Sequence, residues 1–375
     1  MWKEREGLRC CRGLFRLYYY YYSVHLPIFF FFPAMSRFKQ CLAVINTRSG
    51  AREGLSVFAS ALQRYLDNAG IVHHDFCVPE RDIAHVMAHH AGNVDAVVVC
   101  GGDGTLSSVV NVLAATPGHP LISTPIVSVP CGLQNSIAAS LGIYSAERSV
   151  SAFVIGSLQQ VPLWEVRING AVARYIVSYI AVGTYAMCVK RLHDLDAVGD
   201  DFVALPMVKG KYRMGALYTA LRNEVVPCSA KVTYGGEGGN GKAGKHGRAP
   251  LLIASPMKML LAAQMPLQHR HYTLTPRATF KCGSLCVTYA TEAATRLRIW
   301  HLLSREAAQG VVMHEDGVGE VVGVSEVELE VHDASWSGCG QSDVIMMLDG
   351  EAVRLPPGTK VLVQRVPCRV LFASC

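Results

Sequence analysis

The run VDAVVVCGGDGTLSSVVNVL at residues 94–113 restricts the fold more than any other segment of the chain. An apolar stretch ends at Gly101, and apolar residues then recur at helical spacing from Leu106 onward. A buried strand that turns through glycines directly into a helix is typical of a parallel α/β sheet. Backbone N–H groups and the positive end of the helix dipole converge in such a turn. The segment therefore predicts an α/β domain with an anion site at residues 101–105.

The same alternation of short apolar runs and helical patterns extends over residues 35–162. Apolar runs that predict buried strands lie at 41–45, 71–78, 95–100 and 125–129. Because these runs are continuously apolar rather than alternating, they predict a parallel sheet that is covered on both faces. We therefore expect an N-terminal open parallel α/β nucleotide-binding domain in this part of the chain.

From residue 163 onward the pattern becomes that of antiparallel strands. Two apolar runs flank Asn169-Gly170, a dipeptide favoured in type I′ hairpin turns. Further strand-like runs follow, and helical patterns interrupt them at about 207–223 and 291–308. The predicted fold class is therefore α/β, with a C-terminal, mostly antiparallel, β-sandwich-like domain at residues 163–375.

Residues 1–34 differ from the rest of the chain. They combine basic residues with a tyrosine run at 18–22 and a phenylalanine run at 29–32, and prolines interrupt the apolar stretch. No run of 18 apolar residues occurs here or later, so we expect no transmembrane span. We expect either a non-native or disordered leader, with Met35 as the true start, or an uncleaved anchor at a membrane surface.

Charge and cysteine content exclude some function classes. The net charge is +6 over 375 residues, without a basic stripe that is interleaved with aromatics, so we expect no nucleic-acid partner. The 13 cysteines are scattered, which favours reduced thiols over a disulfide framework. The histidine pairs at 73–74 and 89–90 are interpreted as partly solvent-facing residues rather than metal ligands.

Two further loops follow predicted parallel strands. INTRSG occupies residues 45–50, and VPCGLQN occupies residues 129–135. Loops at the carboxyl ends of parallel strands line one crevice, where open α/β sheets bind ligands. The glycine loop lacks both the GK[ST] of a P-loop and the GxGxxG fingerprint. Asp103 would repel a phosphate there unless it holds a metal or accepts a proton, so the three loops predict a nucleotide site.

The motifs, taken in order, resemble the diacylglycerol kinase catalytic-domain superfamily of lipid kinases, and most closely the pattern of sphingosine kinases. The resemblance covers about residues 38–373. It rests on NTRSG, GGDGTLSSVVNVL and PCGLQNSIAAS, on KGKYRMG at 209–215, and on IMMLDGE at 345–351. It implies ATP and Mg²⁺ as cofactors and a lipid hydroxyl as the phosphate acceptor.

The resemblance also implies individual roles. Asp103 would be the general base, or orienting group, for the lipid hydroxyl, and Asp349 would help to hold Mg²⁺. The implied ATP-binding residues are Asn46, Arg48, Ser49, Gly50, Gly101, Gly102, Gly104, Thr105, Gly132, Asn135, Arg213 and Glu351.

Three departures from the family pattern bear on activity. Leu133-Gln134 stands where the family has a small hydroxyl residue and glycine, and Ser108 replaces a glutamate. The segment GTYAMC at 183–188 lacks the carboxylate that contacts the lipid headgroup in sphingosine kinases. Asp194 or Asp196 are candidate substitutes for that carboxylate, and a solvated acidic loop is the alternative.

We expect an ATP-dependent kinase that phosphorylates sphingosine or another long-chain base, with diacylglycerol or ceramide as alternative substrates. A catalytically impaired relative that binds nucleotide or lipid is the alternative from a different class. An NAD kinase shares GGDGT, but its Asn-Glu motif is missing at the corresponding place. We expect cytoplasmic protein with peripheral membrane association, and the sequence leaves a homodimer open.

Overall fold

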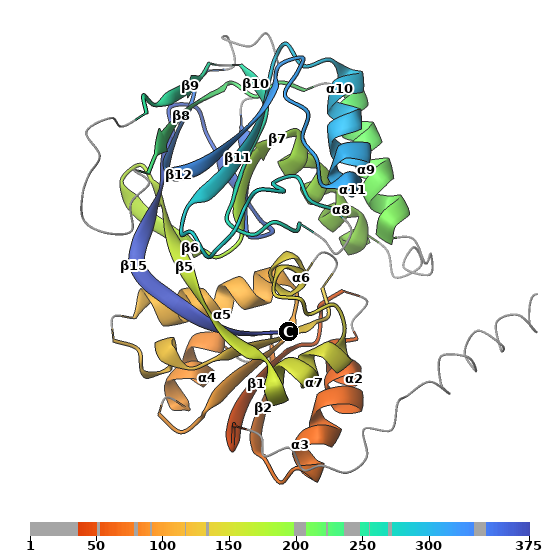
Figure 1. Cartoon of the computed structure of the whole chain (residues 1–375), viewed down its shortest axis with the longest axis vertical. Helices are drawn as coiled ribbons and strands as arrows, with labels where there is room; N and C mark the ends of the chain where they lie inside the picture. The colour runs from red at the N-terminus through yellow and green to blue at the C-terminus, as the bar shows by residue number, and fades with distance from the viewer. Residues whose placement is uncertain are drawn as a thin grey trace, which may run out of the picture. The chain divides into compact units, whose positions relative to one another are not determined.

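Four parallel strands form the N-terminal part of the sheet in the computed structural model, in the order β2-β1-β3-β4. Their bounds are β1 (Gln40–Asn46), β2 (Val72–Val78), β3 (Ala96–Gly101) and β4 (Ile126–Pro130). The connecting helical segments are α2 (Gly54–Val57), η1 (Phe58–Gln63), α3 (Arg64–Asn68), α4 (Ile83–His89), α5 (Asp103–Ala115), η2 (Pro120–Ser123), α6 (Ser136–Ser140) and α7 (Ala146–Ile155). The predicted parallel α/β arrangement is confirmed (Figure 1).

The C-terminal part is built from antiparallel strands with helices packed beside them. Its strands are β5 (Ser157–Ile168), β6 (Ala171–Ile176), β7 (Tyr179–Gly183), β8 (Cys228–Tyr234), β9 (Leu251–Ile253), β10 (Met257–Ala263), β11 (Leu285–Thr291), β12 (Val318–Val331), β13 (Val344–Leu348), β14 (Glu351–Leu355) and β15 (Lys360–Ser374). Its helical segments are α8 (Thr184–Val198), α9 (Val208–Arg222), α10 (Arg296–His301), η3 (Leu302–Glu306) and α11 (Ala307–Gln309). The predicted β-rich second part is likewise confirmed.

The structure describes residues 37–50, 53–78, 82–90, 92–116, 118–132, 135–198, 208–222, 224–235, 248–254, 256–268, 272–333 and 343–375, and in α8 and α9 it omits the side chains of 193, 195–198 and 208–214. Residues 37–375 form one unit. The predicted leader, Leu133-Gln134, and the side chains of Asp196 and Arg213 lie outside the described residues.

Strands β5 and β15 join the two parts. They pair with each other along almost their whole length, and β15 also lies parallel to β4 through Phe372 and Ile126. Val361 and Val363 of β15 pack in the core of the antiparallel part, whereas Val370 and Phe372 pack in the core of the α/β part. One long strand therefore contributes to both cores (Figure 1).

Some elements differ from the sequence prediction. Strand β10 is not among the predicted strands, and its run MKMLLAA includes Lys258, a charged residue that is nevertheless buried. Helix α8 begins at Thr184, immediately after β7, in a stretch for which the sequence predicts no helix. Strand β10 is buried throughout, whereas α8 is mostly buried near its start and more exposed further along, so the two segments share no single local pattern.

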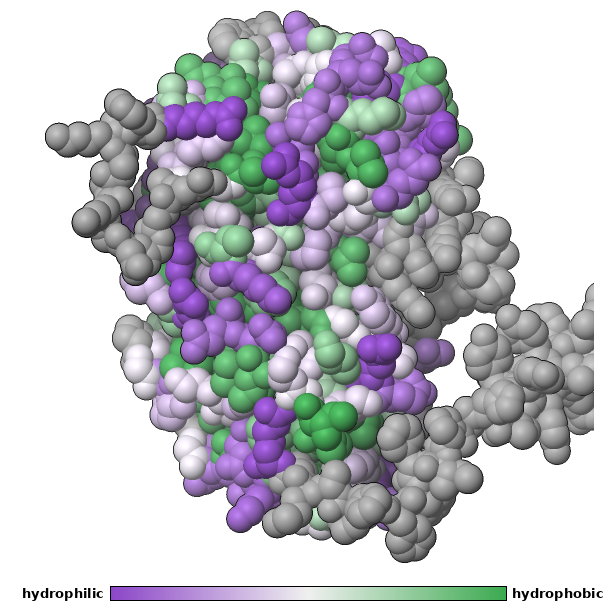
Figure 2. Space-filling model, viewed as in Figure 1, coloured by the Kyte–Doolittle hydropathy of each residue, from purple (hydrophilic) through white to green (hydrophobic). Residues whose placement is uncertain are grey.

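The surface mixes polar and apolar side chains. On the face shown in Figure 2, hydrophilic and hydrophobic residues are interspersed. The exposed large hydrophobic residues of the described chain include Leu221 and Leu297. Within the described ranges, no helix is both long enough and apolar enough to cross a membrane.

Candidate nucleotide site

Three loops meet at the carboxyl edge of the parallel strands. Strand β1 ends at Asn46, and Gly101 and Pro130 are paired at the ends of β3 and β4. The Cys131 N–H donates to the Gly101 carbonyl at 3.1 Å, so the glycine loop and the following PCG loop run side by side. The structure thus brings together the three loops from which the sequence predicts a nucleotide site.

Asn46 links the first loop to the start of α5. Its side-chain amide donates to Thr105 Oγ1 at 2.8 Å, and its Oδ1 accepts the backbone N–H of Arg48 at 2.9 Å. Ser49 is buried beside these groups, whereas the Arg48 side chain is exposed. The first loop is therefore fixed by its own asparagine, and the Arg48 side chain extends from it into solvent.

Glycines allow the three loops to approach one another closely. A Cβ on Gly132 would lie 2.4 Å from the Gly102 Cα, and a Cβ on Gly50 would lie 2.2 Å from the Cys131 carbonyl oxygen. Gly50 also has a φ of +57°, which disfavours other residues. Asn135, itself in the left-handed region, closes the last loop by bonding both the N–H and the C=O of Gly132.

The first turn of α5 is open to an anion. Its N-cap is Gly102, so no N-cap side chain bonds the N–H groups of the first turn. Glu351 lies above this turn, since its Oε1 is 3.5 Å from where a Cβ on Gly104 would be. Arg174 of β6 pairs with Glu351 and donates to Ser107 Oγ at 3.3 Å. A cation and a carboxylate thus border the helix N-terminus.

Asp103 faces helix α6 rather than open solvent. Its Oδ2 accepts from the Ser136 N–H and the Ser136 hydroxyl, both at 2.7 Å, and its Oδ1 accepts from the Ile137 N–H at 2.9 Å. The carboxylate therefore satisfies the orphan donors at the start of α6. It fixes the PCG loop relative to the glycine loop.

Asp349 is the second buried carboxylate at this site, and it is fully enclosed. Its two oxygens accept the backbone N–H groups of Val177, Ser178 and Tyr179 at 2.7–2.9 Å. Burial raises the pKa of Asp349 to about 6, although the three N–H groups oppose the shift, and the charge of Asp103 adds to it. The side chain therefore holds the turn between β6 and β7.

The two carboxylates are connected through serine hydroxyls. Ser136 Oγ, which donates to Asp103, lies 3.3 Å from Ser178 Oγ, and the Ser178 N–H donates to Asp349. All four residues are buried. This chain of polar contacts links the start of α5, the start of α6 and the β6–β7 turn.

Comparison with known proteins identifies the segment that carries these loops. Residues 40–166 match the family described as the diacylglycerol kinase catalytic domain. Within the chain, a 113-residue segment is 34% identical to human (Homo sapiens) sphingosine kinase 1 and 32% identical to the mouse (Mus musculus) enzyme.

The extent of these similarities is limited. The matched segment covers 29% of this chain, and it spans 29% and 30% of the length of the two relatives. The solved structure of a diacylglycerol kinase from Bacillus anthracis covers 91% of this chain and 98% of its own, with a TM-score of 0.56 and 13% identity. At that identity the structural match establishes the fold alone.

Most of the predicted site residues lie in or beside these three loops. Asn46 bonds Thr105 across two loops, and Asn135 closes its own loop onto Gly132. Gly50, Gly102 and Gly132 lie where the loops approach closely, and Ser49, Gly101 and Gly104 lie within them. Asp194 has a different partner: its exposed carboxylate pairs with Lys190 of the same helix, with Nζ and Oδ2 2.5 Å apart. The predicted substrate role of Asp194 and Asp196 and the predicted ATP-binding role of Arg213 stay predictions, as do the catalytic, nucleotide-binding and metal-binding roles of the residues at the loops.

Sequence reasoning missed Arg174 and Ser136. Arg174 stands on β6 outside every family motif, and the arginine on an otherwise apolar strand at AVARYI was the one available signal. Ser136 directly follows Asn135 at the start of α6, where hydroxyl residues are common in first turns. Ser108, which replaces the family glutamate, donates to the Gly104 carbonyl at 2.9 Å within its own helix.

Cys131 lies in the last of the three loops. Burial raises the pKa of Cys131 to about 11, so this loop cysteine stays a thiol at neutral pH. In the parts of the chain that the structure describes, no three His, Cys, Asp or Glu side chains are arranged to hold a metal ion.

Proposed function

We propose that this chain is an ATP-dependent lipid kinase that transfers the γ-phosphoryl group of ATP to a hydroxyl of a long-chain base such as sphingosine. The observation that carries the proposal is the open first turn of α5, bordered by glycines and Asp103, in a catalytic domain similar to that of sphingosine kinase 1. Phosphoryl transfer relies mainly on positioning and on charge stabilisation, and this site offers both.

The nucleotide phosphates would bind at the N-terminus of α5. The uncapped N–H groups of the first turn suit phosphate oxygens, and Gly102 and Gly104 carry no side chain that would block the approach. Arg174 would supply a positive charge once a phosphate competes with Glu351 for its guanidinium.

Magnesium would be held at this site by few protein ligands. Asp103 and Asp349 already accept hydrogen bonds on both of their oxygens, whereas the Glu351 side chain is 44% exposed. Glu351 is therefore the carboxylate best placed to hold Mg²⁺, which usually keeps several waters and binds through phosphates and one or two carboxylates. When bound, the ion neutralises charge on the transferring phosphate.

Asp103 would act on the lipid hydroxyl. In this structure it already accepts a hydroxyl, that of Ser136, at 2.7 Å, which is the interaction that a substrate alcohol would form. We infer that the substrate hydroxyl binds beside Ser136 and that Asp103 orients it and accepts its proton during transfer. Because α6 donors hold the carboxylate, its position is set before substrate binds.

The lipid chain would lie in the apolar antiparallel part. A third core there joins β7, β10 and β13 to helices α8, α10 and η3 through residues that include Ala186, Met259 and Leu302. Leu221 of α9 and Leu297 of α10 are exposed on helices that contribute to this core, and apolar side chains of this kind favour docking at a membrane surface. We propose a cytoplasmic enzyme that associates peripherally with membranes.

A kinase assay tests the proposal. The full chain is given ATP and Mg²⁺ with sphingosine, diacylglycerol or ceramide in mixed micelles, and Asp103→Asn serves as the matched variant because asparagine can still cap α6. We expect phosphorylated sphingosine from the wild type and at least about 100-fold less from the variant.

Two results would contradict the proposal. Equal amounts of product from the wild type and Asp103→Asn would show that Asp103 has no role in the transfer. ATP binding by calorimetry without turnover on any lipid would favour the nucleotide-binding relative, a role consistent with the occupied carboxylate of Asp103 and with the loss of a glutamate at Ser108.

A further inference from the structure

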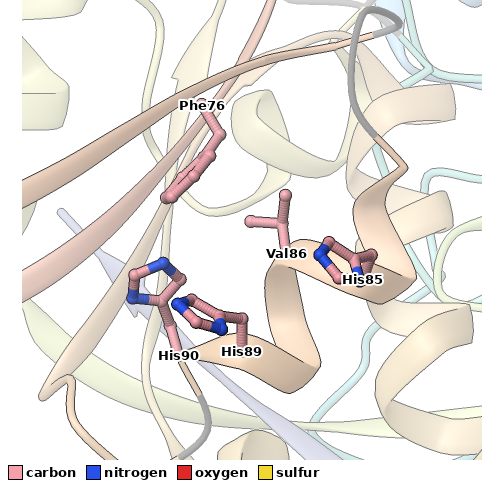
Figure 3. A pocket seen from close by; sticks show the side chains of 5 residues that line it. All are labelled: Phe76, His85, Val86, His89 and His90. Atoms are coloured by element: carbon pink, nitrogen blue, oxygen red, sulfur yellow. The ribbon is translucent and has the colours of Figure 1, made fainter.

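A group of histidines lies away from the nucleotide loops, between the edge strand β2 and helix α4. A pocket of about 350 Å³ there is lined by Phe76, His85, Val86, His89 and His90. Figure 3 shows the imidazoles on the α4 side of the pocket and Phe76 on the opposite side. The lining residues include no carboxylate, lysine or arginine, so imidazole nitrogens are the polar groups that the pocket offers to a ligand.

His85 and His89 share one face of the helix. Their spacing is i, i+4, and the rings are nearly parallel, with an interplanar angle of 15° and centroids 6.4 Å apart. Two histidines at this spacing on one helix face are a recognised way to chelate a transition metal. A neutral imidazole has one unprotonated ring nitrogen that can bind a metal ion, and such ligands suit Zn²⁺, Ni²⁺ and Cu²⁺.

The pair can reach the geometry that a metal requires. With metal–nitrogen distances of about 2.0–2.1 Å, two imidazoles on one ion have centroids about 5 Å apart, so the rings must approach by about 1 Å. Both side chains are exposed, so rotation about their torsions meets little packing resistance. The His90 ring packs against His89, with centroids 4.9 Å apart, and also against His74 and Phe76.

We propose that His85 and His89 form a two-imidazole site for a divalent transition-metal ion at the mouth of this pocket, with the remaining coordination positions filled by water. The site would link successive turns of α4 and stabilise that helix, which packs beside α5. This inference does not depend on the kinase reaction, because its residues and its ligand are separate from the nucleotide loops.

The full chain, expressed without a polyhistidine tag and stripped with a chelator, is titrated with Ni²⁺ by calorimetry. We expect one site in the wild type and in His314→Gln, a matched control in which an exposed histidine outside the pocket is replaced. His85→Gln and His89→Gln should each weaken Ni²⁺ binding by about tenfold or more. His90→Gln should change the affinity by less than about threefold, because its ring supports the pocket without binding the ion.

A second measurement guards against misfolded variants. Circular dichroism must be unchanged, and Ni²⁺ should raise the Tm of the wild type and of His314→Gln but not that of His85→Gln. Equal Ni²⁺ affinity in the wild type, His85→Gln and His89→Gln would overturn the proposal. Binding that is lost only in His90→Gln, or only after alkylation of the exposed Cys282 and Cys375, would also overturn it, because other ligands would then hold the ion.

Discussion

At the scale of single residues, the site is organised by carboxylates that accept donors from the backbone. Asp103 caps α6, Asp349 caps the turn at residues 177–179, and both are buried. A buried acceptor with all its bonds formed is fixed in position, because each lost bond would leave an unsatisfied donor. Glu351 differs, since it is partly exposed and pairs with Arg174, so it can exchange partners when a ligand binds.

Replacing Arg174 by glutamine should weaken nucleotide binding more than it weakens the fold. The change removes the charge beside the N-terminus of α5, so we expect about a tenfold rise in the KM for ATP, measured by steady-state kinetics. The free energy of unfolding should fall by only about 0.5–1 kcal/mol, because the partner carboxylate is partly exposed.

The matched control is Arg167→Gln, on the neighbouring strand, where Arg167 pairs with Glu165 instead. This variant should leave the KM for ATP unchanged. An equal rise of the KM in both variants would mean that the effect comes from the hairpin and not from the charge of Arg174.

Asp349 should make stability depend on pH. Because its folded pKa is raised from 3.8 to about 6, the folded state holds a proton that the unfolded chain releases between these values. The protonated Asp349 therefore contributes fully to the free energy of unfolding below about pH 4. This contribution is lost as the pH rises through 6, by about 2 kcal/mol between pH 4 and pH 7. Asp349→Asn lacks this component.

Urea unfolding at several pH values measures this effect. The wild-type free energy of unfolding should fall relative to that of Asp349→Asn as the pH rises from 4 to 7. Parallel curves for the two proteins would show that the carboxyl group is ionised throughout, with its three N–H donors outweighing burial.

At the scale of elements, helix α5 is tied to strand β6 by one side chain. Asn111 donates to the Tyr175 carbonyl at 2.8 Å and accepts the Tyr175 N–H at 2.8 Å, so it replaces a strand partner for that residue. The helix that begins at Asp103 is thereby fixed to the strand that carries Arg174. The position of the cation relative to the anion site depends on this link.

Asn111→Ala should cost about 1–3 kcal/mol of unfolding free energy, because it leaves both polar groups of Tyr175 without a partner. It should also raise the KM for ATP by loosening β6. Ser108→Ala on the same helix removes only a bond within the helix, so it should cost less than about 0.5 kcal/mol. Chemical denaturation compares the two, and similar losses in both would contradict the role given to Asn111.

At the scale of the whole molecule, β15 couples the two cores. Phe372 is fully buried in the core of the α/β part, although its strand begins in the antiparallel part. The last residue also returns to the α/β part, since the Cys375 N–H donates to the Leu141 carbonyl at 3.0 Å. Both cores therefore contain residues of β15.

Phe372→Ala should destabilise the protein by about 3–5 kcal/mol and should unfold both parts in one transition. Leu371→Ala is the matched control, because Leu371 is next to Phe372 but its side chain is only partly buried. This change should lower the free energy of unfolding by about 1 kcal/mol. Tryptophan fluorescence and circular dichroism follow the unfolding. Two separate transitions in Phe372→Ala would show that β15 does not couple the parts.

Much of the α/β part and its loops could be predicted from the sequence alone. Apolar runs, helical periods and glycine turns are local, and they encode burial and backbone freedom directly, which is why Gly101, Gly132 and Asp103 were placed at the correct edge. The hairpin at Asn169-Gly170 was predicted for the same reason, and it is confirmed.

The tertiary structure alone decided which distant residues meet. Arg174 reaches Glu351 across 177 positions of sequence, Asp349 reaches Val177 across 172, and Phe372 fills a core that begins at Phe38. Local periodicity reports how deeply a residue is buried, but not against which partner it packs. Partner choice depends on strand order and register, and these emerge only when the whole sheet is assembled.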